Sequence, residues 1–213
     1  MRDSSLGWGA RAITERLSFL LGVALVVGAC SNAPATRPTY YLVTITSGNA
    51  TQQAATERVM RLAPVELAPY LGVEGIVVQT SETTVEQARQ HLWAEDLASQ
   101  IQRDLRRGLS SRLPGLRVVP PGGTLPEKGA STLSVTVESF QGRFDGYAVV
   151  AGDWRLRGPD GATRASGSFN QEQALASDGY RALVNSLQVA WRGALSAIAQ
   201  GLRGHRELAA DSG

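Results

Sequence analysis

The feature that most constrains the fold is a long one-sided helix near the C-terminus. From Asp178 to about Leu202, apolar residues recur at helical spacing, while Arg181, Gln188 and Arg192 fall on the opposite face. The apolar residues are Tyr180, Leu183, Val184, Leu187, Trp191, Ala194, Leu195, Ile198 and Leu202. Burial of each large side chain contributes about 1.5 to 3 kcal/mol, so the stripe needs a sheet to cover it. We favour this interpretation over membrane-surface binding, because the polar face has few cations.

Strand-like segments supply that sheet. Runs rich in β-branched and aromatic residues, or alternating apolar with polar residues, predict strands at 40–45, 58–62, 76–80, 133–138 and 147–157, with 83–87 a possible hairpin partner. The sequence Gly158-Pro159-Asp160-Gly161 predicts a turn into a return strand that ends near Gln173. Strands therefore precede a helix twice along the chain.

The earlier helix has leucine or isoleucine at every fourth position from Leu97 to Leu113, follows the acidic pair Glu95 and Asp96, and ends at Pro114-Gly115. The predicted fold class is α+β: a largely antiparallel sheet with two amphipathic helices packed on one face. We expect a single domain at 40–203, with a turn-rich loop at 120–130 and a disordered tail at 204–213.

The N-terminal segment has the features of an export signal. Its apolar run, Leu17 to Ala29, has thirteen residues, whereas a spanning helix needs roughly 20. A weakly positive head precedes this run, and Cys30, the only cysteine of the chain, closes it. The end Val27-Gly28-Ala29-Cys30 resembles the bacterial lipobox, in which a peptidase cleaves between the last two residues and the thiol carries lipid. We therefore expect a lipoprotein signal peptide at 1–29, cleaved between Ala29 and Cys30.

The segment at 30–39 would then be a lipidated cysteine and a flexible tether, because 31–39 is small, polar and interrupted twice by proline. Ser31 at the position after the cysteine favours the outer membrane, by resemblance to the Gram-negative sorting rule. Residues 30–213 carry 18 basic and 17 acidic side chains, so no nucleic-acid partner is expected. Arg103, Arg106 and Arg107 are interpreted as a solvated helix face.

Candidate catalytic residues are few. The chain lacks the motifs of serine hydrolases, zinc proteases, nucleotide-binding loops and CxxC redox sites. His91, at the mouth of the first predicted helix, is interpreted as exposed or capping, and His205 lies in the tail. Asp145 and Asp153 lie at opposite ends of strand-forming sequence. We expect no catalytic residues, no metal site and no cofactor.

Several stretches, in their order and spacing, resemble the PqiC family, also called YmbA, of ABC-type transport auxiliary lipoproteins. They are Tyr40-Tyr41-Leu42, Gly75 to Thr80, Leu92-Trp93-Ala94, Leu113-Pro114-Gly115, Glu138 to Gly146, Val150 to Trp154, Asp178-Gly179-Tyr180 and Trp191. The likeness covers residues 40 to 203 and departs from the family mainly around 120–130 and after 203.

The resemblance implies an outer-membrane lipoprotein that faces the periplasm and is not an enzyme. It implies an accessory role in intermembrane lipid transport, in which the protein docks a periplasm-spanning, MCE-domain partner of the PqiB type. It also implies a homo-oligomer, such as a ring of copies. The open alternatives are a periplasmic lipid carrier, with an acyl chain held between sheet and helices, and an envelope enzyme.

Gly142 to Gly146 is the candidate contact site. Two glycines around Arg143, Phe144 and Asp145 most simply serve a tight strand connection. The sharper hypothesis is that Arg143 and Phe144, a cation and an aromatic ring in a turn, contact the MCE partner.

Overall fold

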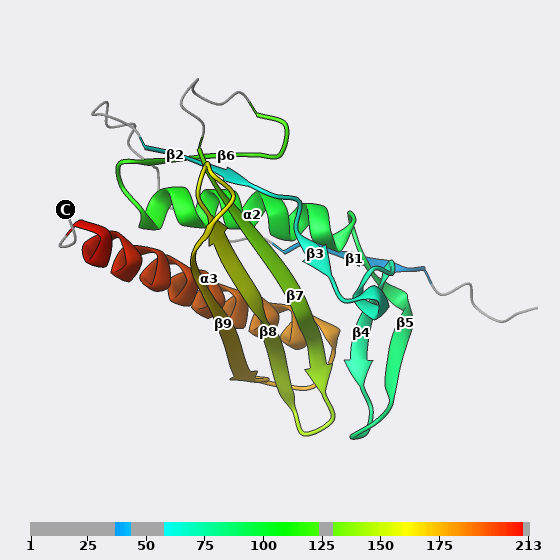
Figure 1. Cartoon of the computed structure of the whole chain (residues 1–213). Helices are drawn as coiled ribbons and strands as arrows, with labels where there is room; N and C mark the ends of the chain where they lie inside the picture. Colours follow the sequence, from blue (N-terminus) through cyan, green and yellow to red (C-terminus); the bar gives the residue numbers. More distant parts are fainter. Residues whose placement is uncertain (1–36, 44–57, 124–129, 211–213) are drawn as a thin grey trace, which may run out of the picture. The chain divides into compact units, whose positions relative to one another are not determined.

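Three long antiparallel strands form the body of the sheet in the computed structural model, which describes residues 37–43, 58–123 and 130–210, the last six without side chains (Figure 1). They are β7 (Ser131–Arg143), β8 (Tyr147–Arg157) and β9 (Thr163–Ala174). Every second residue of β8 from Ala148 to Leu156 is buried, so one face of this meander points into the core. The strands predicted at 133–138 and 147–157, the return strand and the turn between β8 and β9 are confirmed. The strand predicted at 40–45 ends at Tyr41, and residues 44 and 45 lie outside the described residues.

The other edge of β7 is shared by three short strands, all parallel to it: β2 (Arg58–Leu62), β3 (Glu66–Leu67) and β4 (Gly75–Gln79). Pro64 and Pro69 lie between these pieces. Because proline has no N–H to donate to a ladder, it breaks this pairing into segments. A 3₁₀ turn at Pro69–Leu71 joins β3 to β4.

The remaining strands extend the sheet at both sides. β5 (Val85–Trp93) pairs antiparallel with β4, β1 (Thr39–Tyr41) runs parallel to β5, and β6 (Leu116–Val119) runs parallel to β2. The longest ladders are antiparallel, as predicted. Five shorter parallel pairings are added by tertiary structure, because the chain crosses over between the strands that form them.

The first helix, α2 (Leu97–Arg112), begins and ends where the sequence predicts. The Asp96 carboxylate accepts a hydrogen bond from the backbone N–H of Ser99 at 2.8 Å, which caps the first turn. Gly115 follows the helix with a φ of 75°, in the left-handed region that favours glycine. The leucine and isoleucine stripe of the helix is buried.

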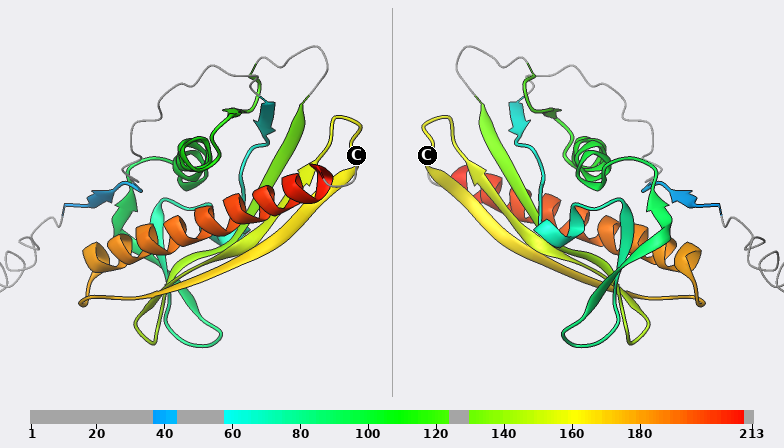
Figure 2. Two further views of the ribbon diagram at one scale, coloured as in Figure 1. Left: turned by 90° about the vertical axis from the view of Figure 1, so that its left-hand side faces the viewer. Right: turned by 90° about the vertical axis from the view of Figure 1, so that its right-hand side faces the viewer.

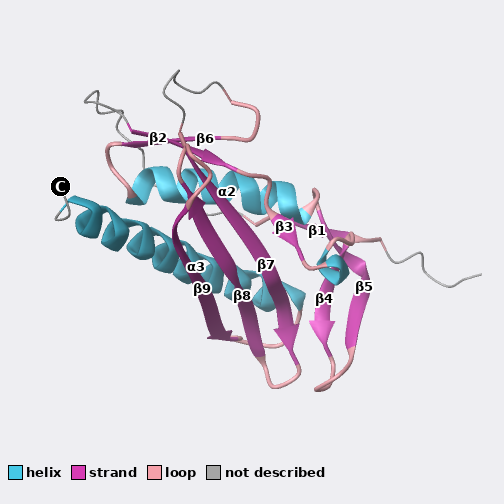
Figure 3. Ribbon diagram, in the orientation of Figure 1, coloured by secondary structure: helices cyan, strands magenta, loops and turns pink. Residues whose placement is uncertain are grey.

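The second helix, α3 (Tyr180–Ala210), crosses the inner face of β7, β8 and β9, and α2 lies on the same side of the sheet (Figures 2 and 3). The two helices touch at Gly108, where a Cβ atom would lie 2.7 Å from Leu195 Cδ1. The α+β class with both helices on one face is thus confirmed. The helix continues to Ala210, past the end near Leu202 that periodicity predicted.

Aromatic rings fill the space between α3 and the sheet. Trp191 is fully buried, with its ring centroid 6.5 Å from that of Phe140 and 6.3 Å from that of Phe169, both edge-on. Aromatic pairs favour this geometry. The apolar face of α3, from which the sequence predicted a covering sheet, therefore lies at the centre of the core.

Candidate functional site

The predicted lipid site has no described geometry. Ala29 and Cys30 lie outside the described residues, and so does most of the predicted tether. The described part starts at Arg37, and the compact unit of the fold starts at Pro38. Among residues 37–43, 58–123 and 130–210, no helix combines the length and apolarity needed to span a bilayer.

The first strand is held by side chains from several elements. The Tyr41 hydroxyl lies 3.1 Å from His91 Nδ1, and the imidazole stacks on the ring of Tyr180 with centroids 4.0 Å apart. His91 is thus a half-buried residue of β5, and our interpretation of it as an exposed or capping residue at the helix mouth is wrong. β5 continues to Trp93, whereas the sequence pattern indicated a strand only at 83–87. Burial raises the pKa of the Tyr180 hydroxyl, helped by the nearby charge of Glu86.

Two further hydrogen bonds fix the chain just after β1. The backbone N–H of Val43 donates to Gln100 Oε1 at 2.7 Å, and Gln188 Nε2 donates to the carbonyl of Leu42 at 3.1 Å. Gln100, on α2, is fully buried. The point where the chain enters the domain is therefore joined to both helices and to β5.

At the end of the β7–β8 hairpin, Arg143 uses three of its five N–H donors within the protein. Its guanidinium donates to both carboxylate oxygens of Glu172 on β9, at 2.7 and 2.9 Å, and to Asp145 Oδ1 at 2.8 Å. The guanidinium carbon also lies 5.4 Å above the ring of Tyr147. These bonds raise the pKa of Arg143 and hold the pKa values of Asp145 and Glu172 below their usual range.

The other predicted contact residue, Phe144, is exposed at the tip of the same hairpin. The glycines beside it have structural roles. Gly146 has a φ of 84°, and a Cβ on Gly142 would lie 2.9 Å from Val78 Cγ1 and 3.0 Å from Leu183 Cδ2. The structure brings Arg143 and Phe144 together but gives them different environments, one paired and one free to contact other molecules.

Sequence reasoning missed Glu172, although the register of the sheet contains the signal. Arg143 is opposite Tyr147, and Tyr147 is opposite Ala174. The two turn sequences around 144–146 and 158–161 specify those hairpins, so they place Glu172 one pleat away from Arg143 on the same face.

The outer face of the β7–β9 meander is polar and slightly hollowed. A concavity of about 730 Å³ lies over it, lined by Glu66, Ser134, Thr136, Glu138, Asp153, Trp154, Arg155, Arg157, Ser166, Gly167 and Ser168. Most lining side chains are hydroxyls or charged groups. They form the solvated face of a half-buried sheet.

Nothing in the described part of the chain groups three or more histidine, cysteine, aspartate or glutamate side chains closely enough to hold a metal ion. Asp153 lies six residues beyond Tyr147 on β8, roughly 20 Å along an extended strand, so it does not meet Asp145 at the hairpin. The envelope-enzyme alternative required a buried, polar, pKa-shifted cluster in a cleft. Two carboxyls with lowered pKa values, Asp145 and Glu172, form exposed ion pairs and not such a cluster.

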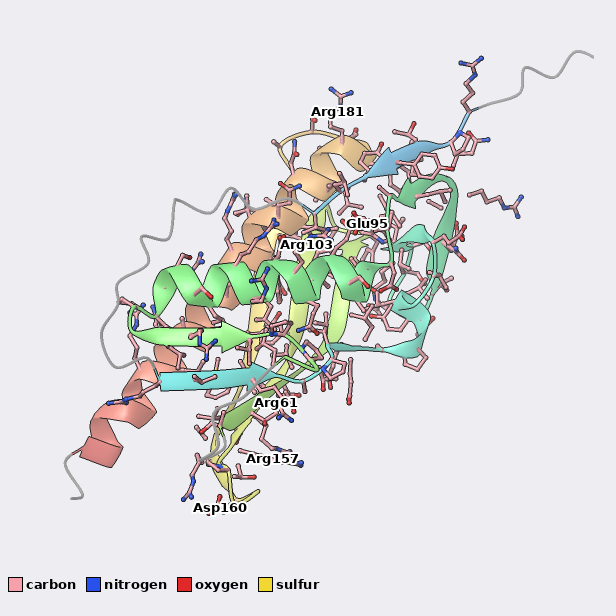
Figure 4. All side chains as sticks on the ribbon, turned by 90° about the horizontal axis from the view of Figure 1, so that it is seen from above. Arg61, Glu95, Arg103, Arg157, Asp160 and Arg181 are labelled. Atoms are coloured by element: carbon pink, nitrogen blue, oxygen red, sulfur yellow. The ribbon has the colours of Figure 1, made fainter. Side chains whose placement is uncertain are left out.

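On α2, Arg103 forms an ion pair with Glu95, with Nη1 2.8 Å from Oε2 (Figure 4). Figure 4 shows the two side chains together over the N-terminal half of the helix. An arginine paired in this way belongs to a solvated helix face, as the sequence indicated, and does not add to a basic patch.

Residues 40–199 match the family of ABC-type transport auxiliary lipoprotein components. The chain is 32% identical over 181 residues to the intermembrane transport lipoprotein PqiC of Escherichia coli (strain K12), which covers 84% of this chain and 94% of that protein. PqiC of Shigella flexneri matches to the same extent.

Two solved structures share the fold. A crystal structure of an uncharacterised protein, 31% identical, superimposes with a TM-score of 0.67 over 78% of this chain and 99% of its own. A protein from Xanthomonas campestris, 15% identical, gives a TM-score of 0.65 over 81% of this chain and 99% of its own. The second likeness concerns the fold alone.

Proposed function

Because the chain belongs to the family of ABC-type transport auxiliary lipoprotein components, we propose that it is the outer-membrane accessory subunit of an intermembrane lipid transport system. In this role it docks the periplasm-spanning MCE-domain protein at the outer membrane. The observation that carries the proposal is the match over nearly the whole domain to a protein named as an intermembrane transport lipoprotein.

Membrane attachment is assigned to lipid on Cys30 after cleavage behind Ala29. One acyl chain holds a protein only marginally, whereas two or more give stable attachment. The segment at 31–39 would connect the lipid to β1, which the contacts of Tyr41 and Val43 fix to the domain. Such an arrangement holds the domain near the bilayer without a spanning helix.

Two observations support docking over chemistry. Asp145 and Glu172, two carboxyls with lowered pKa values, are engaged in ion pairs at the surface, and the core is filled by aromatic rings. We further propose that several copies assemble around the partner as a homo-oligomer. Symmetric assembly of identical subunits is the common way to build a ring-shaped seat.

The deciding experiment is to isolate the protein from detergent-solubilised envelopes and identify what accompanies it. We expect to find the MCE-domain protein in the eluate and the acylated chain in the outer-membrane fraction. We expect native mass spectrometry to show an oligomer. A Cys30→Ser variant is the matched control and should leave the membrane fraction. An unacylated, freely soluble wild-type protein would contradict the proposal, and so would an eluate that lacks the MCE-domain protein.

A further inference from the structure

Two hairpins end side by side at one end of the sheet. Val78 of β4 is opposite Gly142 of β7, so the β4–β5 turn lies next to the β7–β8 turn. Figure 1 shows the two turns adjacent, and both views of Figure 2 show them projecting in the same direction.

The sheet register aligns one row of residues across this end. Val85 on β5 is opposite Gln79 on β4, Gln79 follows the Val78–Gly142 pair, and Arg143 on β7 is opposite Tyr147 on β8. Neighbouring strands lie about 4.8 Å apart, so the row from Val85 to Tyr147 spans roughly 14 Å. That width suits a contact patch of a few side chains.

Three large apolar side chains at this end are exposed: Val85 and Tyr147 at the two ends of the row, and Phe144 in the turn that follows Arg143. Phe144 is 54% exposed in the turn, Val85 46% and Tyr147 38%. Among the exposed large hydrophobic residues of the described chain, these three share one end of the sheet. A single exposed apolar residue needs no explanation, whereas a group of aromatic and aliphatic side chains at one end of a sheet is typical of a contact site.

Arg143 does not add a free cation to this surface. Its hydrogen bonds to Glu172 and Asp145 join β7, the turn and β9, and so fix the hairpin that carries Phe144. In the docking surface inferred below, Arg143 therefore has a positioning role, and direct contact of its guanidinium with the partner stays a prediction.

Acidic side chains outnumber basic ones in the segments that form this end of the sheet. The segments 79–86, 142–147 and 172–181 contain five carboxylates and two arginines, all described. The carboxylates are Glu82, Glu86, Asp145, Glu172 and Asp178, and the arginines are Arg143 and Arg181. This end of the sheet is therefore net negative, and it suits a partner with a basic rim.

We propose that the two hairpin ends form one docking surface for an apolar pocket ringed by lysine and arginine on the MCE-domain partner. Phe144 is its central apolar group, and Val85 and Tyr147 flank it. The inference rests on the proposed function, because that function supplies the partner. The negative charge argues against an anionic bilayer as the occupant, because carboxylates are repelled from such a surface.

The test uses the full acylated chain in detergent and the MCE-domain protein recovered with it. We expect Phe144→Ser to weaken capture by about tenfold or more, as for a central contact residue. We expect Glu82→Lys to weaken capture of the partner. Capture by this variant should also depend less on the salt concentration than capture by the wild type does. Matched controls are Tyr40→Ser, an apolar residue 61% exposed on β1, and Asp153→Lys, an acidic residue in the middle of β8. Both controls should capture the partner as the wild type does.

Glu172→Gln separates positioning from contact. It should increase amide hydrogen exchange in the turn and weaken capture less than Phe144→Ser does. Thermal unfolding checks that each variant is folded. Because Phe144 and Glu82 lie in exposed turns, we expect both of their variants to fold.

Equal capture by wild type and by a folded Phe144→Ser variant would overturn the docking surface and leave the proposed function standing. Absence of the partner from the wild-type eluate would overturn both. Two other results would assign the surface to a different occupant and contradict the inference. The first is loss of binding of the Cys30→Ser chain to phosphatidylglycerol vesicles when Phe144 is replaced. The second is loss of the homo-oligomer in that variant.

Discussion

Arg143 and Glu172 lie two strands apart and are joined by two parallel hydrogen bonds, Nη1 to Oε1 at 2.7 Å and Nη2 to Oε2 at 2.9 Å. Such bidentate geometry is the most specific form of an arginine–carboxylate pair. The pair crosses β8 on the outer face, directly beside the exposed Phe144. It connects the β7–β8 hairpin to β9.

The first prediction concerns the ionisation of this group. In the folded protein the pKa values of Asp145 and Glu172 lie below their usual range of about 4, chiefly because of hydrogen bonds from Arg143. Their ion pairs therefore stabilise the fold above that range, and this contribution is lost as the pH falls through the lowered values. We expect Arg143→Gln to return both pKa values toward about 4 in an NMR titration of the carboxyl carbons. Unchanged titration midpoints in the variant would contradict the assignment.

The second prediction concerns Gly152 in β8. A Cβ at this position would overlap the carbonyl oxygen of Thr136 on β7, and it would lie 2.9 Å from Phe169 Cζ. Because backbone must move to make room, we expect Gly152→Ala to lower the free energy of unfolding by about 1 to 3 kcal/mol. Gly204→Ala is the control: it lies exposed in α3 with nothing within 4 Å, and should stabilise the helix by about 0.5 to 1 kcal/mol. Urea unfolding measures the free energy of unfolding of both variants. The same change in the two variants would show that the close contact at Gly152 does not destabilise the Gly152→Ala variant.

The third prediction concerns the attachment of the first strand. Replacing Gln100 by leucine leaves the buried N–H of Val43 without its acceptor, so the free energy of unfolding should fall by about 1 to 3 kcal/mol. Hydrogen exchange at the Val43 amide should rise in parallel. Gln188→Leu, which removes an exposed bond to the carbonyl of Leu42, should change stability by about 0.5 kcal/mol or less. A Val43 amide that stays protected in Gln100→Leu would rule out this role.

The fourth prediction separates the docking subunit from a lipid carrier. Trp191, Phe140 and Phe169 occupy the space between α3 and the sheet where an acyl chain would have to lie. We therefore expect the chain with Cys30→Ser, purified from cells, to carry no stoichiometric lipid in native mass spectrometry. One bound lipid per chain would favour the carrier.

The sequence by itself determined the features that depend on local patterns. Side-chain period and turn chemistry depend on neighbouring residues, so they can be read from sequence. Alternation predicted β7 and β8, the turn Gly158-Pro159-Asp160-Gly161 predicted the hairpin to β9, and the stripe from Tyr180 to Leu202 predicted α3. The same stripe required a sheet on one side, so the α+β class followed. The family resemblance also depended on sequence alone, and the matched region 40–199 supports it.

Tertiary structure alone decided how distant segments meet. Three features depend on residues far apart in the chain. The first is the parallel pairing of β2, β3 and β4 along one edge of β7. The others are the place of His91 between Tyr41 and Tyr180, and the meeting of two hairpin ends at Val78 and Gly142. Parallel pairing leaves no local signature, because its partners are joined by crossovers rather than by a turn. For the same reason Phe144 could be singled out from its own turn, whereas Val85 and the charges around it could be added only once the sheet was assembled.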